Sequence, residues 1–368
     1  MKSKYKFSEL IEEISEQNIE LKYGLDDIVG VTIEKGLIPT IANLQQTALN
    51  KFYIVKPDTF VYNPRTHGVR LGMGFNKTNY TYITSWNNIA FKVKDDALRI
   101  LNPEYLWLYF NRSEWDRETN YHAWGSSTIV FSWNTFLNLE IQIPEKSYQD
   151  NLVRQYNAIK RRIALKQQIN DNLAEQLISQ FMIFVEGLDR TAQLNSICSF
   201  VSEKATFGDL DNQVYVSTEN ILPNKQGINY FGTTELNDRI TPFKEGDVLI
   251  ANIRPYFKKI WQCNQSGACN ADVLCFRADD NKYKYILKAI LYQDSFYDYV
   301  MSGAKGTKMP RGDKDHIMKY LIPNIPEESI IKFNLFATEI ERIQSKSLEE
   351  IKILSEMKSY LLTTLSSR

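Results

Sequence analysis

The feature that most constrains the fold of this chain is an internal repeat. Three segments of the first half recur in the same order in the second half: 7–16 resembles 194–203, 58–65 resembles 247–254, and 90–93 resembles 275–278. The displacement between matched segments drifts only slowly along the chain, as two copies with small loop insertions would produce. The repeat therefore predicts two homologous domains, each with its own core.

The two copies also end alike. Gly125-Ser-Ser-Thr128 leads to Ile143-Pro-Glu145, as Gly306-Thr-Lys-Met309 leads to Ile325-Pro-Glu327, and one long helical pattern follows each Pro-Glu. Within each copy we expect a short amphipathic helix, at 7–16 and 194–203, followed by a β-rich body. Apolar and β-branched runs bounded by turn residues predict strands at 59–62, 89–93, 247–251 and 273–277, and helices follow near 103–112 and 283–292.

The predicted fold class is α+β, with two homologous mixed α/β domains separated by two long antiparallel helices in a circular, pseudo-two-fold arrangement. The domains are expected at 1–149 and 188–328, and the helices at 150–187 and 329–368, the first ending at Gly187. At about 1.5 Å per residue, each helix is roughly 50–55 Å long. The alternative is one ordinary helical hairpin inside a single core. It is disfavoured because one helix lies between the copies and the other at the chain end.

Both helices carry apolar residues at the three- and four-residue spacing of helix-on-helix packing. The residues predicted to pack the pair are Leu152, Tyr156, Ile159, Ile163, Ile169, Leu173, Leu177 and Phe181 on the first helix, and Phe336, Ile340, Ile343, Ile351, Leu354, Leu361 and Leu365 on the second.

The charge distribution points to nucleic acid although the net charge is zero. Residues 59–94, 248–271 and 299–312 contain no Asp or Glu but carry Arg and Lys, and a phosphate-binding surface must exclude carboxylates locally. Each of these basic residues could contact a base or a phosphate, or it could be a solvated surface charge with no role in binding. The predicted DNA contacts are Arg65, His67, Arg70, Asn76, Lys77, Arg254, Lys258, Lys259, Lys305, Thr307, Lys308 and Arg311.

No catalytic centre is evident. The four cysteines match no zinc-site spacing, so we expect them to be buried thiols on strands, and no metal site is predicted. Asn63-Pro-Arg lacks the rest of an amino-methyltransferase motif, and Gly72-Met-Gly74 lacks the context of a cofactor loop. For Trp124 we prefer a core position over a groove contact. The absence of a signal peptide and of a long apolar segment leads us to expect a cytoplasmic protein.

The chain resembles the specificity (S) subunit of Type I restriction–modification systems. The segments that carry the resemblance are KEGDVLIANIR at 244–254, GTKMPRG at 306–312, the Ile-Pro-Glu junctions and the two long helices, while 152–181 looks like the central conserved region of that family. The first body departs from the pattern at 63–67 and 125–128, which leaves open which bases it reads.

The resemblance implies a non-catalytic, DNA-binding subunit. Each body would be a target recognition domain for one half of a bipartite asymmetric DNA sequence, and the helix pair would set the spacer. Two DNA methyltransferase (M) subunits would dock on the helices, and two restriction (R) subunits can join. S-adenosylmethionine would bind M, and ATP and Mg²⁺ would bind R, so no cofactor is expected in this chain.

Two rival functions remain at this stage. One is the recognition region of a fused methyltransferase–nuclease, which we disfavour because the chain starts at Met1 and closes its repeat. The other is a scaffold protein with two binding heads and a coiled-coil bridge, which predicts no basic acid-free segments.

Overall fold

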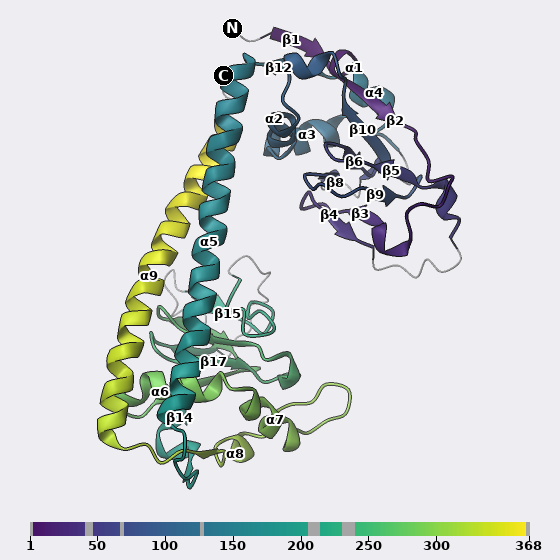
Figure 1. Cartoon of the computed structure of the whole chain (residues 1–368). Helices are drawn as coiled ribbons and strands as arrows, with labels where there is room; N and C mark the ends of the chain where they lie inside the picture. The colour runs from purple at the N-terminus through teal and green to yellow at the C-terminus, as the bar shows by residue number, and fades with distance from the viewer. Residues whose placement is uncertain are drawn as a thin grey trace. The chain divides into compact units, whose positions relative to one another are not determined.

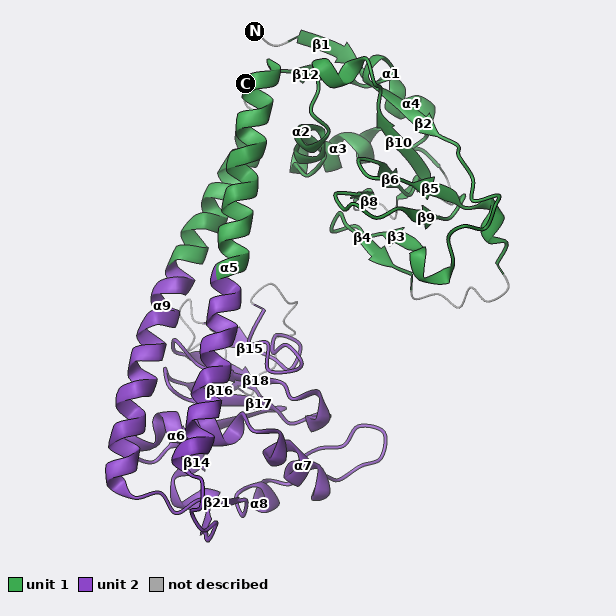
Figure 2. Ribbon diagram, in the orientation of Figure 1, with its two compact units in different colours: residues 1–165, 350–368 green, residues 166–349 purple. Residues whose placement is uncertain are grey.

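The computed structural model describes residues 3–40, 47–66, 70–125, 129–204, 214–229 and 240–365, and it confirms a mixed α/β fold (Figure 1). The chain divides into two compact units (Figure 2). Unit 1 comprises Met1–Leu165 with Glu350–Arg368, and unit 2 comprises Lys166–Glu349. The division falls inside both long helices, α5 (Lys146–Phe184) and α9 (Glu327–Thr364), whereas the sequence placed its boundaries at the helix ends. No described helix is long and apolar enough to cross a membrane.

Unit 1 contains a central antiparallel sheet in the order β2-β10-β6-β8 and several two-stranded sheets. The helices α2 and α3 follow β10 in sequence, with Asn102 capping α2 through bonds from two backbone N–H groups. The elements before α5 are β1 (Ser3–Lys6), α1 (Phe7–Leu10), β2 (Ile11–Ile14), β3 (Val29–Val31), β4 (Leu37–Pro39), β5 (Tyr53–Val55), β6 (Phe60–Tyr62), β7 (Arg65–Thr66), β8 (Met73–Phe75), β9 (Tyr82–Thr84), β10 (Ile89–Val93), α2 (Pro103–Phe110), α3 (Ser113–His122), β11 (Ile129–Val130), α4 (Trp133–Asn138) and β12 (Glu140–Ile143).

Unit 2 repeats this plan with the sheet β14-β20-β17-β18, and it adds a three-stranded sheet, β15-β19-β16. Its elements between the long helices are β13 (Ala192–Gln193), the 3₁₀ turn η4 (Leu194–Ser196), β14 (Cys198–Phe200), β15 (Val214–Val216), β16 (Ile240–Phe243), β17 (Val248–Ala251), the 3₁₀ turn η6 (Pro255–Phe257), β18 (Ile260–Gln262), β19 (Gly267–Asn270), β20 (Val273–Ala278), α6 (Lys284–Leu291), α7 (Asp294–Ser302), α8 (Lys314–Ile317) and β21 (Leu321–Ile322).

Strand pairing establishes the repeat residue by residue. Ile11 pairs with Val93 in unit 1 as Cys198 pairs with Ala278 in unit 2, and β1 pairs with β12 as β13 pairs with β21. The helices also correspond in order, α2 with α6, α3 with α7 and α4 with α8. Two copies of one fold therefore account for nearly every described element of the two central sheets.

The register corrects one part of the sequence alignment. Phe60 pairs with Phe91 as Val248 pairs with Phe276, so Phe60 corresponds to Val248. The match of 58–65 with 247–254 had instead placed Phe60 at Leu249. A one-residue shift matters because it exchanges the two faces of a strand. The corrected alignment matches Asp58 with Gly246, and both have positive φ, 60° and 92°.

The prediction of an amphipathic helix at 7–16 and 194–203 was wrong beyond its first turn. Only α1 is helical in the first segment, and the residues from Ile11 to Ile14 form β2, which bonds to β10. In the second segment, η4 is followed by β14. The four-residue apolar spacing suits either structure locally, and pairing with the sheet edge decides in favour of the strand.

Each unit has its own core. In unit 1 it is rich in aromatic rings, and the Phe7 ring lies 4.8 Å from Phe136 and 5.7 Å from Trp115, with centroids in edge-to-face arrangements. The same core includes Leu365, near the end of α9. The core of unit 2 includes Phe181 of α5 and Phe333 of α9, whose centroids are 5.4 Å apart. The core of unit 1 thus contains residues from both ends of the chain, Phe7 and Leu365.

The long helices pack antiparallel, but two predicted packing residues are corrected. Ile169 and Ile343 are 44% and 37% exposed. The step from Ile163 to Ile169 spans six residues, which rotates the side chain about 120° away from the seam. The less exposed positions of both helices follow a seven-residue repeat, and polar residues occupy some of them. These polar residues are Lys166 and Asn170 on α5 and Gln344 and Ser347 on α9. Across this seam Gln344 Nε2 donates to the Asn170 carbonyl at 2.9 Å.

Candidate nucleic-acid interface

Each unit presents a hairpin that follows α3 or α7. In unit 2 it spans 305–311, and Lys305 and Arg311 exchange two backbone hydrogen bonds of 2.9 Å. In unit 1 Trp124 and Val130 exchange the equivalent bonds, of 3.1 and 2.9 Å. We call these the hairpins of unit 2 and unit 1, and of the second the structure describes Trp124, Gly125, Ile129 and Val130. The shared pattern aligns Trp124 with Lys305, and it also aligns Gly125 with Gly306, both at positive φ.

A second loop supports each hairpin. In unit 2 the loop after β17 is joined to the hairpin because Arg254 N–H donates to the Pro310 carbonyl at 2.8 Å and Ile253 bridges to Arg311. In unit 1 β7 pairs with β11, which places Arg65 opposite Val130. Two loops far apart in sequence therefore form one joined surface in each unit, and such loops on a rigid sheet are where binding residues concentrate.

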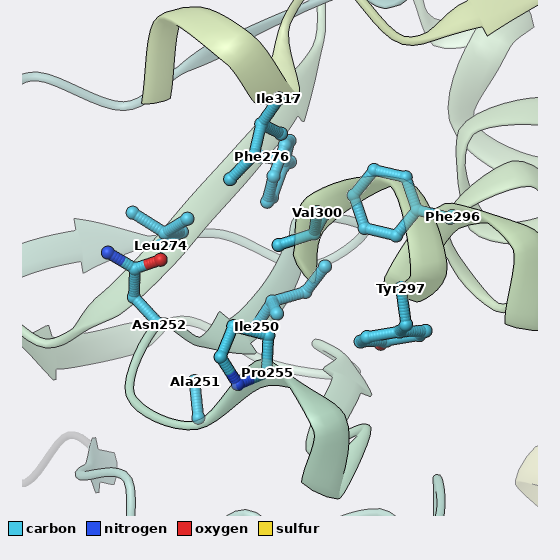
Figure 3. Close-up of a pocket in the computed structure, with 10 residues that line it drawn as sticks. All are labelled: Ile250, Ala251, Asn252, Pro255, Leu274, Phe276, Phe296, Tyr297, Val300 and Ile317. Carbon is cyan, nitrogen blue, oxygen red and sulfur yellow. The ribbon is translucent and has the colours of Figure 1, made fainter. Parts of the chain in front are cut away.

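The loop of unit 2 is held in a strained conformation. Arg254 and Lys258 flank η6 with φ of 52° and 51°, which costs roughly 1–2 kcal/mol for each residue with a side chain. The surrounding structure offsets this cost, because the buried Pro255 lines an apolar pocket with Phe296 and Val300 of α7 (Figure 3). The contact of η6 with α7 anchors the loop, while Tyr256 and Phe257 of η6 remain exposed.

The basic residues of the unit 2 loop are bonded to the protein. Lys258 Nζ lies 2.8 Å from an Asp294 oxygen, and Lys225 Nζ lies 2.7 Å from the same atom. These two ammonium groups lower the pKa of Asp294 to about 2. Lys259 donates to the Thr218 carbonyl at 2.7 Å, and partial burial lowers its pKa. Arg254 is half-buried, with a buried Nε that has no hydrogen-bond partner among the described residues.

The hairpin of unit 2 is more accessible. Lys305 is exposed and pairs with Asp313, while Arg311 pairs with Asp272 at 3.2 Å. Thr307 and Lys308 are exposed, and within the described part of the chain Lys308 has no acidic partner. Exposed ion pairs contribute only about 0–1 kcal/mol, so DNA phosphates could replace these carboxylates.

The predicted residues of unit 1 are dispersed. Arg65 is exposed on β7, Arg70 lies 3.7 Å from Asp116, and Lys77 lies 2.9 Å from Glu104. His67 lies outside the described residues. The acid-free segments of the sequence are therefore not acid-free in space, because α2, α3 and later loops supply carboxylates.

Asn76 is removed from the predicted DNA contacts. Its side chain is 1% exposed and donates to the carbonyls of Val55 and Tyr80 at 3.1 and 2.8 Å. Its Oδ1 accepts bonds from the N–H and the hydroxyl of Thr78. All of its side-chain hydrogen-bonding groups are satisfied by the turn at 76–80 and by Val55, so its role is structural.

The preference for a core position at Trp124 was wrong. Trp124 is 80% exposed at the end of the unit 1 hairpin, and Tyr121, at the end of α3, is also 80% exposed. Sequence reasoning missed both, together with Tyr256 and Phe257. The alignment of Trp124-Gly with Lys305-Gly is the signal that could have identified Trp124, because the two positions are equivalent.

The cysteines are buried and free, as predicted. Cys198, Cys269 and Cys275 lie on strands, and Cys263 follows β18. Burial raises the pKa of Cys269 to about 12, which keeps its thiol protonated. Among the described residues, no group of three His, Cys, Asp or Glu side chains could hold a metal ion.

Comparisons with known proteins identify the fold. No protein-family model and no curated protein match the chain. A solved structure of the S subunit of a Type I restriction–modification system from M. genitalium matches with a TM-score of 0.56 and 13% identity, covering 99% of this chain and 96% of that one. The resemblance inferred from the motifs is thus confirmed for the fold over nearly the whole chain.

Two further solved structures match with lower scores. A chain from work on complex assembly and conformational transition of the type I R-M system has a TM-score of 0.48 and 12% identity, covering 99% of this chain and 97% of that one. The HsdS subunit from Thermoanaerobacter tengcongensis has a TM-score of 0.40 and 12% identity, covering 99% and 96%.

Proposed function

We propose that this chain is the non-catalytic DNA-specificity subunit of a Type I restriction–modification complex. The observation that carries the proposal is the fold shared with an S subunit over 99% of this chain and 96% of that one. The residue-by-residue repeat supports it, because two copies of one recognition unit can each bind half of a bipartite, asymmetric DNA target. Each unit joins two loops into one accessible surface of the kind such recognition requires.

We further propose that the helix pair sets the spacer between half-sites and binds the M subunits. In unit 1 an open groove between α5 and α9 is lined mainly by apolar groups, including Ile159, Met357, Tyr360 and Leu361. Tyr360 is 70% exposed, and an exposed apolar surface of this kind marks a protein contact. S-adenosylmethionine would bind M, and ATP with Mg²⁺ would bind R, so catalysis would reside in those subunits.

The proposal is tested by reconstituting the chain with an M subunit and sequencing the methylated DNA. We expect a split motif with a fixed unspecified spacer, and replacing unit 2 by that of a relative should alter one half-site only. A scaffold protein would direct no methylation, and a change in both half-sites would contradict independent units. Adding whole helical turns to both α5 and α9 should lengthen the spacer by about one base pair per 3.4 Å, and an unchanged spacer would contradict the role of the helices.

A further inference from the structure

The two hairpins occupy equivalent positions but carry opposite chemistry. Each closes with two backbone hydrogen bonds between equivalent residues, and each is followed by a capped helix, α4 behind Ser132 and α8 behind Asp313. At the first closing position unit 1 has Trp124 and unit 2 has Lys305. At the second, unit 1 has Val130 and unit 2 has Arg311.

The unit 1 hairpin exposes apolar side chains on both of its described sides. Ile129 and Val130 are 37% and 36% exposed beside Trp124. At the end of the preceding helix, Tyr121 lies edge-on to His122 with ring centroids 4.9 Å apart. A tryptophan normally buries most of its ring area, so this exposure is costly unless a partner covers it.

The unit 2 hairpin indicates what that partner is. Lys305, Lys308 and Arg311 are exposed and complementary to phosphate or to the guanine edge. If the two units bind two halves of one duplex through equivalent loops, as the proposed function requires, the unit 1 hairpin meets DNA as well. An apolar side chain in the major groove can distinguish bases by contact with the thymine 5-methyl group.

We propose that Trp124 is a specificity-determining residue that contacts a thymine methyl group in the half-site of unit 1. Unit 2 reads its half-site through Lys305, Lys308 and Arg311 instead. The two halves of the target then differ in chemistry, one including an A·T pair sensed by apolar contact and the other bound mainly through cations. This inference rests on the proposed function and adds the class of base that unit 1 recognises.

The test measures DNA binding by the complex of this chain with its M subunits, after the wild-type complex has been shown to methylate a defined motif. Failure to obtain such a motif would count against the proposed function itself. With the motif known, we expect Trp124→Ala to weaken specific binding about 5- to 100-fold, with Trp124→Phe restoring most of it. Since Trp124 is exposed, thermal melting of the variant should match the wild type.

Deoxyuridine supplies the decisive substrate, because it lacks only the 5-methyl group of thymidine. Replacing thymidines of the unit 1 half-site by deoxyuridine should weaken wild-type binding and leave the Trp124→Ala complex unaffected. As the counterpart, Lys308→Ala should reduce the slope of log K against log salt by about 1, whereas Trp124→Ala should leave the slope unchanged.

Two results would overturn the inference. In the first, wild type and Trp124→Ala bind the motif equally and both are insensitive to deoxyuridine. In the second, Trp124→Ala loses the M subunit in analytical ultracentrifugation, which would make the hairpin a protein contact.

Discussion

Replacing Phe7 by alanine tests whether the two chain ends share one core. The Phe7 ring is fully buried and contacts the rings of Tyr109, Phe110, Trp115 and Phe136 at centroid distances of 4.8 to 6.3 Å. Burial of an aromatic side chain removes roughly 150–250 Å² from water, which at about 25 cal/mol/Å² amounts to roughly 4–6 kcal/mol. Allowing for partial collapse of the cavity, we expect a loss of about 3–5 kcal/mol.

Hydrogen exchange read by mass spectrometry locates that loss. Phe7→Ala should lower protection in β6 and β10 and, in parallel, at the end of α9 near Leu365, at the opposite end of the sequence. Protection in β17 and β20 should change little. The matched control is Leu194→Ala at the equivalent buried position of unit 2, which should have the reverse effect. The reasoning is refuted if the end of α9 keeps its protection when β10 loses it.

Three further predictions concern stability. Burial lowers the pKa of Lys288 to about 8, so the folded state disfavours the charged form of this side chain. The free energy of unfolding should therefore rise between pH 8 and 10.5. Lys288→Met should remove this rise and add about 1–3 kcal/mol of stability at pH 7, as measured by urea unfolding across pH. If wild type and Lys288→Met showed the same dependence of stability on pH, Lys288 would not be the group responsible. Ser347→Ala should raise stability by about 1 kcal/mol, because the buried Ser347 hydroxyl has no partner among the described residues; a lower melting temperature would argue against this. Arg277 donates to both carboxylate oxygens of the buried Asp247, at 2.9 and 2.7 Å. Arg277→Met should therefore cost about 3–5 kcal/mol of stability, because it leaves a buried charge unpaired, and Asp247→Asn should cost less, because Arg277 is partly hydrated. The opposite order of the two losses in calorimetry would contradict this account.

Local sequence patterns predicted four strands of the central sheets and the two long helices well. The strand at 89–93 is β10 with both ends correct, and those at 59–62, 247–251 and 273–277 differ by one residue. Buried strands of this kind are continuous apolar runs between turn residues, and both features are visible in sequence. The ends of the long helices were predicted within four residues, because apolar residues at three- and four-residue spacing mark an amphipathic helix in the sequence.

The errors arose where distant partners decide the structure. The spacing of Phe7, Leu10, Ile11 and Ile14 suits a helix, but the hydrogen bonds of β10 make its second half a strand. The carboxylate nearest Arg70 belongs to Asp116, far along the chain, so local composition overestimated the positive surface. Exposure at Trp124 has no local signature either, and the equivalence of Trp124 to Lys305 in the repeat is what indicates an exposed position.

The shared core of the chain ends has a consequence for biosynthesis. Unit 2 ends at Glu349, whereas unit 1 includes Glu350–Arg368 and packs Leu365 into its core. A ribosome delivers the chain from its N-terminus, and domains generally fold as units during synthesis. The unit that is translated first is therefore completed last. Until Leu365 has been synthesised, the aromatic core of unit 1 lacks that side chain, and a truncation before Leu365 would remove part of the core of the unit that is made first.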